Sequence, residues 1–248
     1  MRDVALWVDD ARQAWKETTK RGARSIREPF ELKDAEGVVR IASIAAYGDT
    51  IHSFVERSDY KGPFLPGYRA MPEDPLARPT GLLHIDHMVG NVGWNEMNRW
   101  VEFYAHTMGF SLYQHFDDKD ISTEYSALMS KVMANGNGRV KFPINEPAEG
   151  RKKSQIEEYL EFYHGPGVQH IALATNDILQ TVAKLQQQGI AFPVSYTHLD
   201  VYKRQDQVAV AVIAEEQGAD AVSTGRERGE PAHDEFLLQN AFRFEPDV

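Results

Sequence analysis

The chain has 248 residues, enough for one large domain or two smaller modules, and 42% of them are hydrophobic, which is sufficient for a buried core. The formal net charge of −10 argues against a general role in binding nucleic acids or anionic membranes, and the absence of cysteine excludes disulfide bonds and thiolate metal sites. No apolar run approaches the roughly 18 residues of a membrane span, so we expect a cytoplasmic protein without a membrane partner.

The first expected elements are a strand and a helix. Residues 4–8 are largely apolar, and Asp10 follows as a residue that can accept hydrogen bonds from the first free N–H groups of a helix. Gly22 tolerates the left-handed conformation that ends many helices, so we expect this helix to have about three turns. Residues 38–44 and 51–56 then read as two strands joined by a turn.

The middle of the chain continues to alternate strands and helices after a Pro-rich stretch at 63–79, which reads as a linker. The expected elements are a strand at 83–92, a helix at 95–108 that ends at Gly109, strands at 124–133 and 139–145, and a helix at 154–163. The apolar residues of the helix at 95–108 recur at helical spacing, which gives it one apolar stripe.

Two segments of the chain resemble one another at a constant offset. Residues 4–10 align with residues 171–177, an offset of 167 (171 − 4), and the alignment continues without a gap to Gly22 and Gly189. Each copy reads as a strand, an Asp cap, a helix and a terminating Gly. We therefore predict an α+β fold of two related modules, each a strand–helix–strands unit with a curled sheet.

Two histidines on predicted strands are candidates for one metal site. Strand alternation places His87 on the same face as Val89, and His170 on the same face as Ala172, whose small side chain leaves space for a ligand. Two neutral imidazoles and a carboxylate would form a facial triad, which leaves positions open on Fe(II) for a substrate and oxygen. By spacing alone the signal is weak, because a histidine on a strand is more often a structural residue.

The remaining seven histidines lack a second supporting feature, and we expect them to be surface or packing residues: His52, His84, His106, His115, His164, His198 and His233.

Residues 194–205 read VSYTHLDVYKRQ and do not fit the pattern of the rest of the chain. One set of codons for them, with CT added in front, is its own reverse complement and resembles two head-to-head copies of the transposase mosaic end used in sequencing libraries. We therefore interpret these residues as the translation of a sequencing adapter. Residues 206–248 are then an unassigned tail of other origin, with one apolar stretch at 208–214.

Several short motifs occur in the order and spacing of a known family. They are YGDT at 47–50, FLPGY at 64–68, IDHMVGNV at 85–92, PINEP at 143–147, KSQIE at 153–157 and GVQHIAL at 167–173. Together they resemble the 4-hydroxyphenylpyruvate dioxygenase family of the vicinal-oxygen-chelate superfamily, over roughly residues 3–192. The resemblance implies a fold of βαβββ (glyoxalase-like) modules with curled mixed sheets, of which this chain holds two that are incomplete.

The resemblance also implies an activity and a set of site residues. His87 and His170 correspond to two ligands of Fe(II), and four residues match polar positions around the substrate or its supporting network: Ser130, Asn145, Gln155 and Gln169. In this family a 2-oxo acid, 4-hydroxyphenylpyruvate, reacts with O2 to give homogentisate and CO2, a step of tyrosine and phenylalanine catabolism. The resemblance further implies that the intact parent protein forms a homo-oligomer.

The sequence departs from the family pattern at the third iron ligand. In the family this ligand is a glutamate on a late strand, in a context such as FFEIIQR, and no such segment occurs here. Glu245 stands in the nearest imitation, but its surroundings and spacing do not match, so we do not expect it to bind iron. Because two histidines alone bind Fe(II) weakly, we expect this chain to be an impaired fragment of the dioxygenase.

The expected division of the chain follows from these observations. It comprises the remainder of an N-terminal non-catalytic module (1–72), a linker (73–80), the first part of a C-terminal iron-binding module (81–193), the adapter-like segment (194–205) and the tail (206–248).

Two other functions stay open. Hydroxymandelate synthase resembles the dioxygenase and uses the same substrate and iron, but it hydroxylates the side chain of the substrate. The same fold also serves as a metal-free binding cup, in which case His87 and His170 would be ordinary strand residues. Product analysis separates the first two functions, and iron binding separates both of them from the third.

Overall fold

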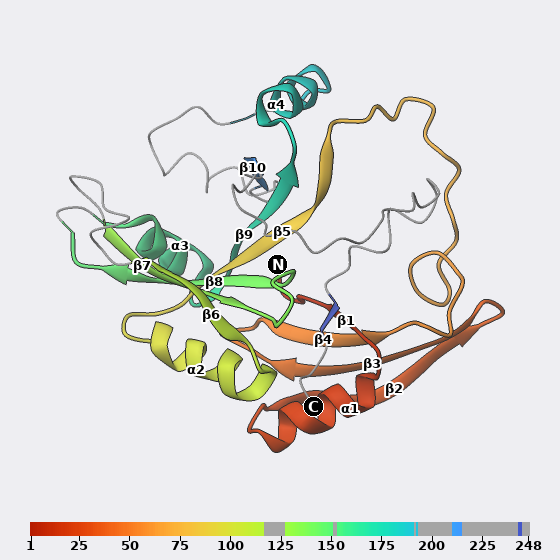
Figure 1. Cartoon of the computed structure of the whole chain (residues 1–248), viewed down its shortest axis with the longest axis horizontal. Coiled ribbons are helices and arrows are strands. Elements are labelled where there is room, and N and C mark those ends of the chain that lie inside the picture. Colours follow the sequence, from red (N-terminus) through yellow and green to blue (C-terminus); the bar gives the residue numbers. More distant parts are fainter. Residues whose placement is uncertain (117–126, 151–152, 191, 193–209, 215–242, 245–248) are drawn as a thin grey trace, which may run out of the picture.

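A computed structural model describes residues 1–116, 127–150, 153–190, 192, 210–214 and 243–244 of the chain (Figure 1). The adapter-like segment at 194–205 and Glu245 lie outside these described residues. Within them, no helix is long and apolar enough to cross a membrane.

The first half of the chain forms one βαβββ unit. Its elements are β1 (Leu6–Val8), α1 (Ala11–Lys20), β2 (Ser25–Asp34), β3 (Gly37–Ala45) and β4 (Ile51–Glu56). In the sheet the strands follow the order β1-β4-β3-β2, with β1 parallel to β4 and the other neighbours antiparallel. The helix therefore links a strand at one side of the unit to the strand at its far edge.

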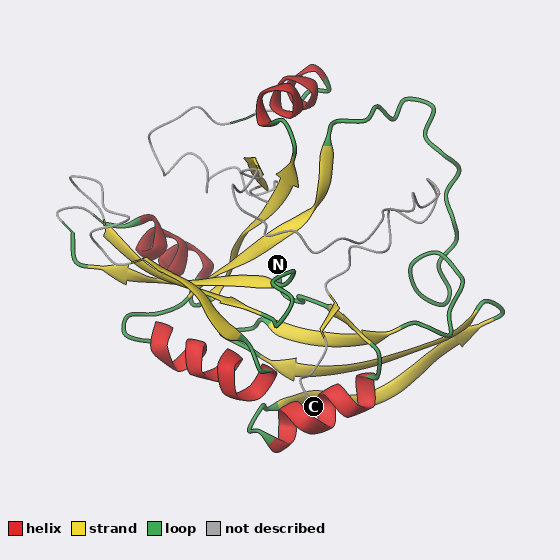
Figure 2. Ribbon diagram, viewed as in Figure 1, coloured by secondary structure: helices red, strands yellow, loops and turns green. Residues whose placement is uncertain are grey.

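The second unit repeats this connectivity. It contains β5 (Leu82–Asn91), α2 (Met97–Met108), β6 (Ser111–Phe116), β7 (Ala127–Ala134) and β8 (Lys141–Ala148). The strand order is β5-β8-β7-β6, again with the first and last strands of the unit parallel. The expected α+β class with βαβββ modules is confirmed. Figures 1 and 2 show α1 and α2 next to each other beneath the strands, where the two helices are in contact.

A third copy of the strand–helix start follows. Helix α3 (Gln155–Tyr163) leads to β9 (Gly167–Thr175) and α4 (Ile178–Gln187), and β9 pairs antiparallel with β5. The bounds of α4 are those of α1 shifted by the offset of 167 found in the sequence. In both helices the predicted Asp cap is present, because Asp10 accepts a hydrogen bond from the Gln13 N–H and Asp177 accepts one from the Gln180 N–H.

The structure adds two strands to the expected elements and shifts the start of one helix. Strands β2 and β6 were not predicted, and helix α2 begins at Met97 rather than at Asn95, whose positive φ of 60° is incompatible with a helical start. In the tail, β10 (Val210–Ala214) lies parallel to β9, and β11 (Arg243–Phe244) lies parallel to β1. The apolar stretch of the tail therefore extends the second sheet.

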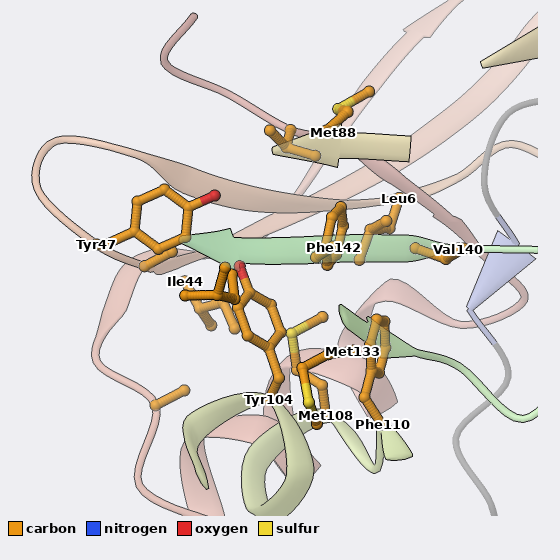
Figure 3. Close-up of a cluster of buried hydrophobic side chains, with 14 of the residues drawn as sticks. Leu6, Ile44, Tyr47, Met88, Tyr104, Met108, Phe110, Met133, Val140 and Phe142 are labelled. Atoms are coloured by element: carbon orange, nitrogen blue, oxygen red, sulfur yellow. The ribbon is translucent and has the colours of Figure 1, made fainter. Parts of the chain in front are cut away.

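One hydrophobic core joins the two units. It contains Leu6 and Ile44 from the first unit together with Tyr104 and Phe142 from the second. Figure 3 shows these side chains in a single cluster, with Leu6 beside Phe142 and Ile44 beside Tyr104. Because this shared core removes apolar surface of both units from water, the two units stabilise one another.

The turn between β3 and β4 enters the contact between the units. The Tyr47 ring packs so close to Gly90 of β5 that a Cβ atom there would lie 2.4 Å from the Tyr47 Cζ. Asp49 accepts a hydrogen bond of 3.0 Å from the Tyr163 hydroxyl, at the end of α3. The YGDT motif at 47–50 therefore packs against β5, which carries His87, and against α3, which precedes the strand that carries His170.

Candidate metal centre

Strands β5 and β9 bring His87 and His170 together. In the antiparallel pair, His87 lies opposite Ala172 and His170 lies opposite Val89, so the histidines are diagonal neighbours on one face. Their ring centroids are 5.8 Å apart, the rings are inclined by 67°, and both side chains are partly buried. The opposite face of β5 contributes Met88 to the core. The two imidazoles therefore converge outside the core, and their binding of a metal stays a prediction.

A β-bulge precedes each of the two histidines. The ladder between β5 and β9 shifts register at Asp86 and again at Gln169, so each is an extra residue in its strand. Side chains of consecutive residues in a regular strand point to opposite faces, but a bulge relaxes this alternation. Asp86 and Gln169 can therefore turn their side chains to the side occupied by the next residue.

The imidazole of His87 is part of a hydrogen-bonded chain. Its Nδ1 lies 2.6 Å from Asp86 Oδ2, and the other carboxylate oxygen accepts a hydrogen bond of 2.5 Å from Lys141 Nζ. The hydrogen bonds from His87 and Lys141 lower the pKa of Asp86 to about 2, so this carboxylate is ionised and can only accept. The proton of neutral His87 is then on Nδ1. Its Nε2 makes no hydrogen bond with the described residues and presents a lone pair.

His170 has a similar partner, but this one is a neutral amide. Its Nδ1 lies 3.1 Å from Gln169 Oε1, the amide oxygen of the preceding residue. Burial, together with the proximity of His87, lowers the pKa of His170 to about 4. The ring is therefore neutral near pH 7, which is the form in which imidazole coordinates metals. As with His87, Nε2 makes no hydrogen bond within the described part of the chain.

A row of buried polar residues crosses the same sheet. Ser130 of β7 lies opposite Asn145 of β8, and Asn145 lies opposite Asn91 of β5. Asn91 is four residues from His87, roughly 13 Å along the strand, and strand alternation places both on one face. Neither the oxygen nor the nitrogen of the Asn91 amide makes a hydrogen bond with the described residues. Asn91 was not among the predicted site residues, although strand alternation from His87 points to it.

Two further polar residues occupy other positions. Gln155 is the first residue of α3, which packs against β5, β8 and β9, and its side chain is exposed. Buried Glu146 accepts a hydrogen bond of 3.0 Å from the Met97 N–H at the start of α2, where Glu96 provides no side-chain cap. Glu146 thus serves α2 as a structural carboxylate.

The described residues contain no group of three or more His, Cys, Asp or Glu side chains that could hold a metal ion. His87 and His170 supply two nitrogen donors, so this part of the chain is one ligand short of a facial triad. Strand β11, which ends just before Glu245, belongs to the sheet of β1. The two histidines lie on β5 and β9, which belong to the other sheet.

Several curated proteins of similar sequence are named 4-hydroxyphenylpyruvate dioxygenase. The chain is 50% identical over 204 residues to a 4-hydroxyphenylpyruvate dioxygenase of Yarrowia lipolytica, a match that covers 79% of this chain and 52% of the relative. It is 46% identical to the enzyme of that name from Dictyostelium discoideum, over 77% of this chain and 54% of the relative. The chain therefore spans about half the length of the curated relatives it matches.

A solved structure and a family model also match this chain. A triple mutant of 4-hydroxymandelate synthase from Streptomyces coelicolor is similar with a TM-score of 0.65 and 25% sequence identity, covering 83% of this chain and 58% of that one. The model of the Glyoxalase/Bleomycin resistance protein/Dioxygenase superfamily matches residues 84–215, a stretch that includes both histidines. The chain belongs to the Glyoxalase/Bleomycin resistance protein/Dioxygenase superfamily.

Proposed function

We propose that this chain carries two iron ligands and part of the substrate pocket of an Fe(II)-dependent dioxygenase that converts 4-hydroxyphenylpyruvate and O2 to homogentisate and CO2. The observation that carries the proposal is the convergence of His87 and His170, each with Nδ1 next to an acceptor and Nε2 available. The names of the similar curated proteins, at 42–50% identity, supply the reaction.

The donor set fits iron in part. Neutral imidazole nitrogen is a suitable ligand for Fe(II), and the pair would occupy two positions of a two-histidine, one-carboxylate triad. Bound there, Fe(II) would supply a centre at which a 2-oxo acid and O2 meet. Because the described residues lack the anionic third ligand, we expect metal to bind this chain more weakly than it binds a complete triad.

In this proposal, the row of buried polar residues formed by Ser130, Asn145 and Asn91 orients the substrate. Ser130 and Asn145 lie on neighbouring strands within the same sheet as the histidines, about 13 Å along β5 from His87. An elongated aromatic 2-oxo acid with one end at the metal would extend its ring toward this row. The amide and hydroxyl groups would then donate and accept hydrogen bonds and hold the ring, without taking part in proton transfer. Gln155 and Gln169 are proposed for the same network.

A second candidate is the formation of 4-hydroxymandelate, because the similar solved structure bears the name of that synthase. The sequence identity of 25% to that protein is about half the identity to the curated dioxygenases, which favours homogentisate as the product. A metal-free binding protein of the same superfamily is the third candidate. Two neighbouring imidazole rings, each with Nδ1 next to an acceptor and with no hydrogen bond at Nε2 among the described residues, favour metal binding over a metal-free cup.

Metal titration and product analysis test the proposal together. Under anaerobic conditions, Co(II) or Fe(II) should bind one ion per chain, and His87→Ala or His170→Ala should each abolish binding. His106→Ala is the matched control, since His106 is exposed on α2. Supplied with 4-hydroxyphenylpyruvate and O2, the loaded chain should form homogentisate, slowly, and no 4-hydroxymandelate. A chain that binds no metal, or that binds it equally well without either histidine, would contradict the proposal.

A further inference from the structure

We propose that Asp86 and Gln169 are positioning residues that fix both imidazoles with the proton on Nδ1 and the lone pair of Nε2 directed at a shared divalent metal. The inference rests on the proposed function, because it assigns the metal to the same two histidines. It adds two residues that do not touch the metal, and it gives Gln169 a role next to His170 in addition to its proposed place in the substrate network.

The backbone supports this assignment at both positions. In a regular strand the residue before a histidine points to the opposite face and cannot reach its imidazole. Here Asp86 and Gln169 are each the extra residue of a bulge, and each places an oxygen atom beside Nδ1 of the next residue. Two bulges at corresponding places, one in each strand of the pair, produce the same contact twice. Bulges cost ladder hydrogen bonds, and their recurrence beside both histidines indicates that they serve this contact.

The chemistry of the acceptors determines which nitrogen carries the proton. A neutral imidazole has one N–H, and an acceptor beside Nδ1 stabilises the tautomer in which that N–H is on Nδ1. The lone pair is then on Nε2, which is the usual arrangement for a histidine ligand whose second nitrogen is held by a carboxylate or carbonyl. Without these acceptors, neither histidine would favour that tautomer, and part of the population would present N–H to the metal.

The two acceptors differ in strength. The Asp86 contact is charge-assisted and short, at 2.6 Å, and Lys141 holds the carboxylate in place through its other oxygen. The Gln169 contact is 3.1 Å long and joins two neutral groups. Loss of Asp86 should therefore affect its histidine more than loss of Gln169 affects the other.

The first measurement is nitrogen NMR of the metal-free full chain at about pH 8, where imidazole is neutral. Nitrogen shifts and couplings to ring protons distinguish Nδ1–H from Nε2–H for each histidine. The wild-type chain should show Nδ1–H for His87 and His170. Asp86→Leu, which removes the acceptor, should raise the Nε2–H population of His87 alone, and Gln169→Leu should do so for His170 alone, whereas Gln169→Glu, which keeps an acceptor, should retain Nδ1–H. A purely structural role would not produce this one-to-one pattern.

The second measurement is Co(II) affinity by titration calorimetry. Loss of a residue that holds a metal ligand commonly weakens metal binding about 10–100-fold. We expect Asp86→Leu to fall in this range and Gln169→Leu to have a smaller effect. Asp49→Asn is the matched control, because Asp49 accepts a hydrogen bond from Tyr163 away from the pair.

The outcomes separate this inference from the proposed function. Nε2–H as the main tautomer in the wild-type chain, or unchanged tautomers in Asp86→Leu and Gln169→Leu, would overturn the positioning roles even if the chain binds metal. Should Asp86→Leu not fold, the wild-type tautomers and the Gln169 variants still decide the matter. The predicted tautomer pattern in a chain that takes up no Co(II) would support the positioning contacts and count against the proposed function alone.

Discussion

The buried histidine of the first unit makes the stability of this fold depend on pH. His52 is fully buried, with Nδ1 3.0 Å from the Val4 carbonyl oxygen and Nε2 2.8 Å from the Tyr104 hydroxyl. Since a carbonyl oxygen can only accept, Nδ1 carries the proton and Nε2 accepts from Tyr104. Burial lowers the pKa of His52 to about 4. A second proton on the ring would leave Nε2 and the tyrosine hydroxyl both as donors.

The magnitude follows from the difference between the folded and unfolded pKa values. The unfolded ring titrates near its model value of 6.5 and the folded ring near 4. The unfolded state therefore binds more protons between these values, and the stability is fully present above pH 6.5 and is lost as the pH falls toward 4. At 1.36 kcal/mol for each pKa unit, the full loss is about 3 kcal/mol.

The assay is urea unfolding at a series of pH values from about 7 to about 4.5, on the wild-type chain and on His52→Gln. Glutamine keeps one donor and one acceptor but does not titrate. The wild-type chain should lose about 2–3 kcal/mol more than the variant over this range. His170, whose pKa is also lowered, contributes equally to both proteins and cancels in the difference. His106→Gln, at an exposed position, should behave as the wild type does.

Two results would refute this reasoning. One is a parallel pH dependence of the unfolding free energy in the wild-type chain and in His52→Gln. The other is a titration midpoint near 6.5 for the His52 ring protons in the folded wild-type chain, measured by NMR. The NMR measurement also serves if His52→Gln is too unstable for the denaturant series.

Three substitutions test the packing around the candidate site by thermal or urea unfolding. Gly90→Ala should destabilise the chain by about 1–3 kcal/mol, because the new Cβ would lie 2.4 Å from the buried Tyr47 ring. Glu146→Ala should cost about 1–2 kcal/mol, because the Met97 N–H at the start of α2 loses its acceptor. Asn91→Leu should stabilise the chain by about 1–3 kcal/mol, because it removes a buried amide that has no hydrogen-bond partner among the described residues.

Each of these three expectations has its own control or contrary result. Gly93→Ala should be milder than Gly90→Ala, since its Cβ would meet only the flexible Glu96 side chain. Glu146→Gln, which keeps an acceptor oxygen, should recover most of the stability lost in the alanine variant, and equal losses in the two would contradict the capping role. A destabilised Asn91→Leu would mean that the amide is satisfied by contacts outside the described residues.

The helices were predictable because their signals are local. Asp10 and Asp177 cap their helices as expected, and Gly109 ends α2 with a positive φ of 71°. A polar cap, an apolar stripe and a terminal glycine all lie within one short stretch of sequence. Strand alternation only made His87 and His170 candidates, and the resemblance of the motifs around them to the dioxygenase family singled them out as a pair.

The parts that the sequence analysis missed depend on contacts between distant segments. Strands β2 and β6 are edge strands with many exposed side chains, among them Ile26, Leu112 and Tyr113, so they carry no clear alternation of apolar and polar residues. The bulges at Asp86 and Gln169 could not be read from the sequence either. Regular strand alternation would place Asp86 and Gln169 on the faces opposite their neighbouring histidines. The register shifts between β5 and β9, which depend on how the two strands pair, interrupt this alternation.

The common core of the two units means that a break in the covalent chain between them need not separate them. Residues 61–81 contain no helix or strand, so a protease could cut there without removing a strand from either sheet. The piece that ends before the cut would lose the contact of Tyr47 with Trp100 if it left, and Phe142 of the other piece would lose its stacking on His52. Two polypeptides made separately should therefore reassemble on mixing, each serving as the template on which its counterpart folds.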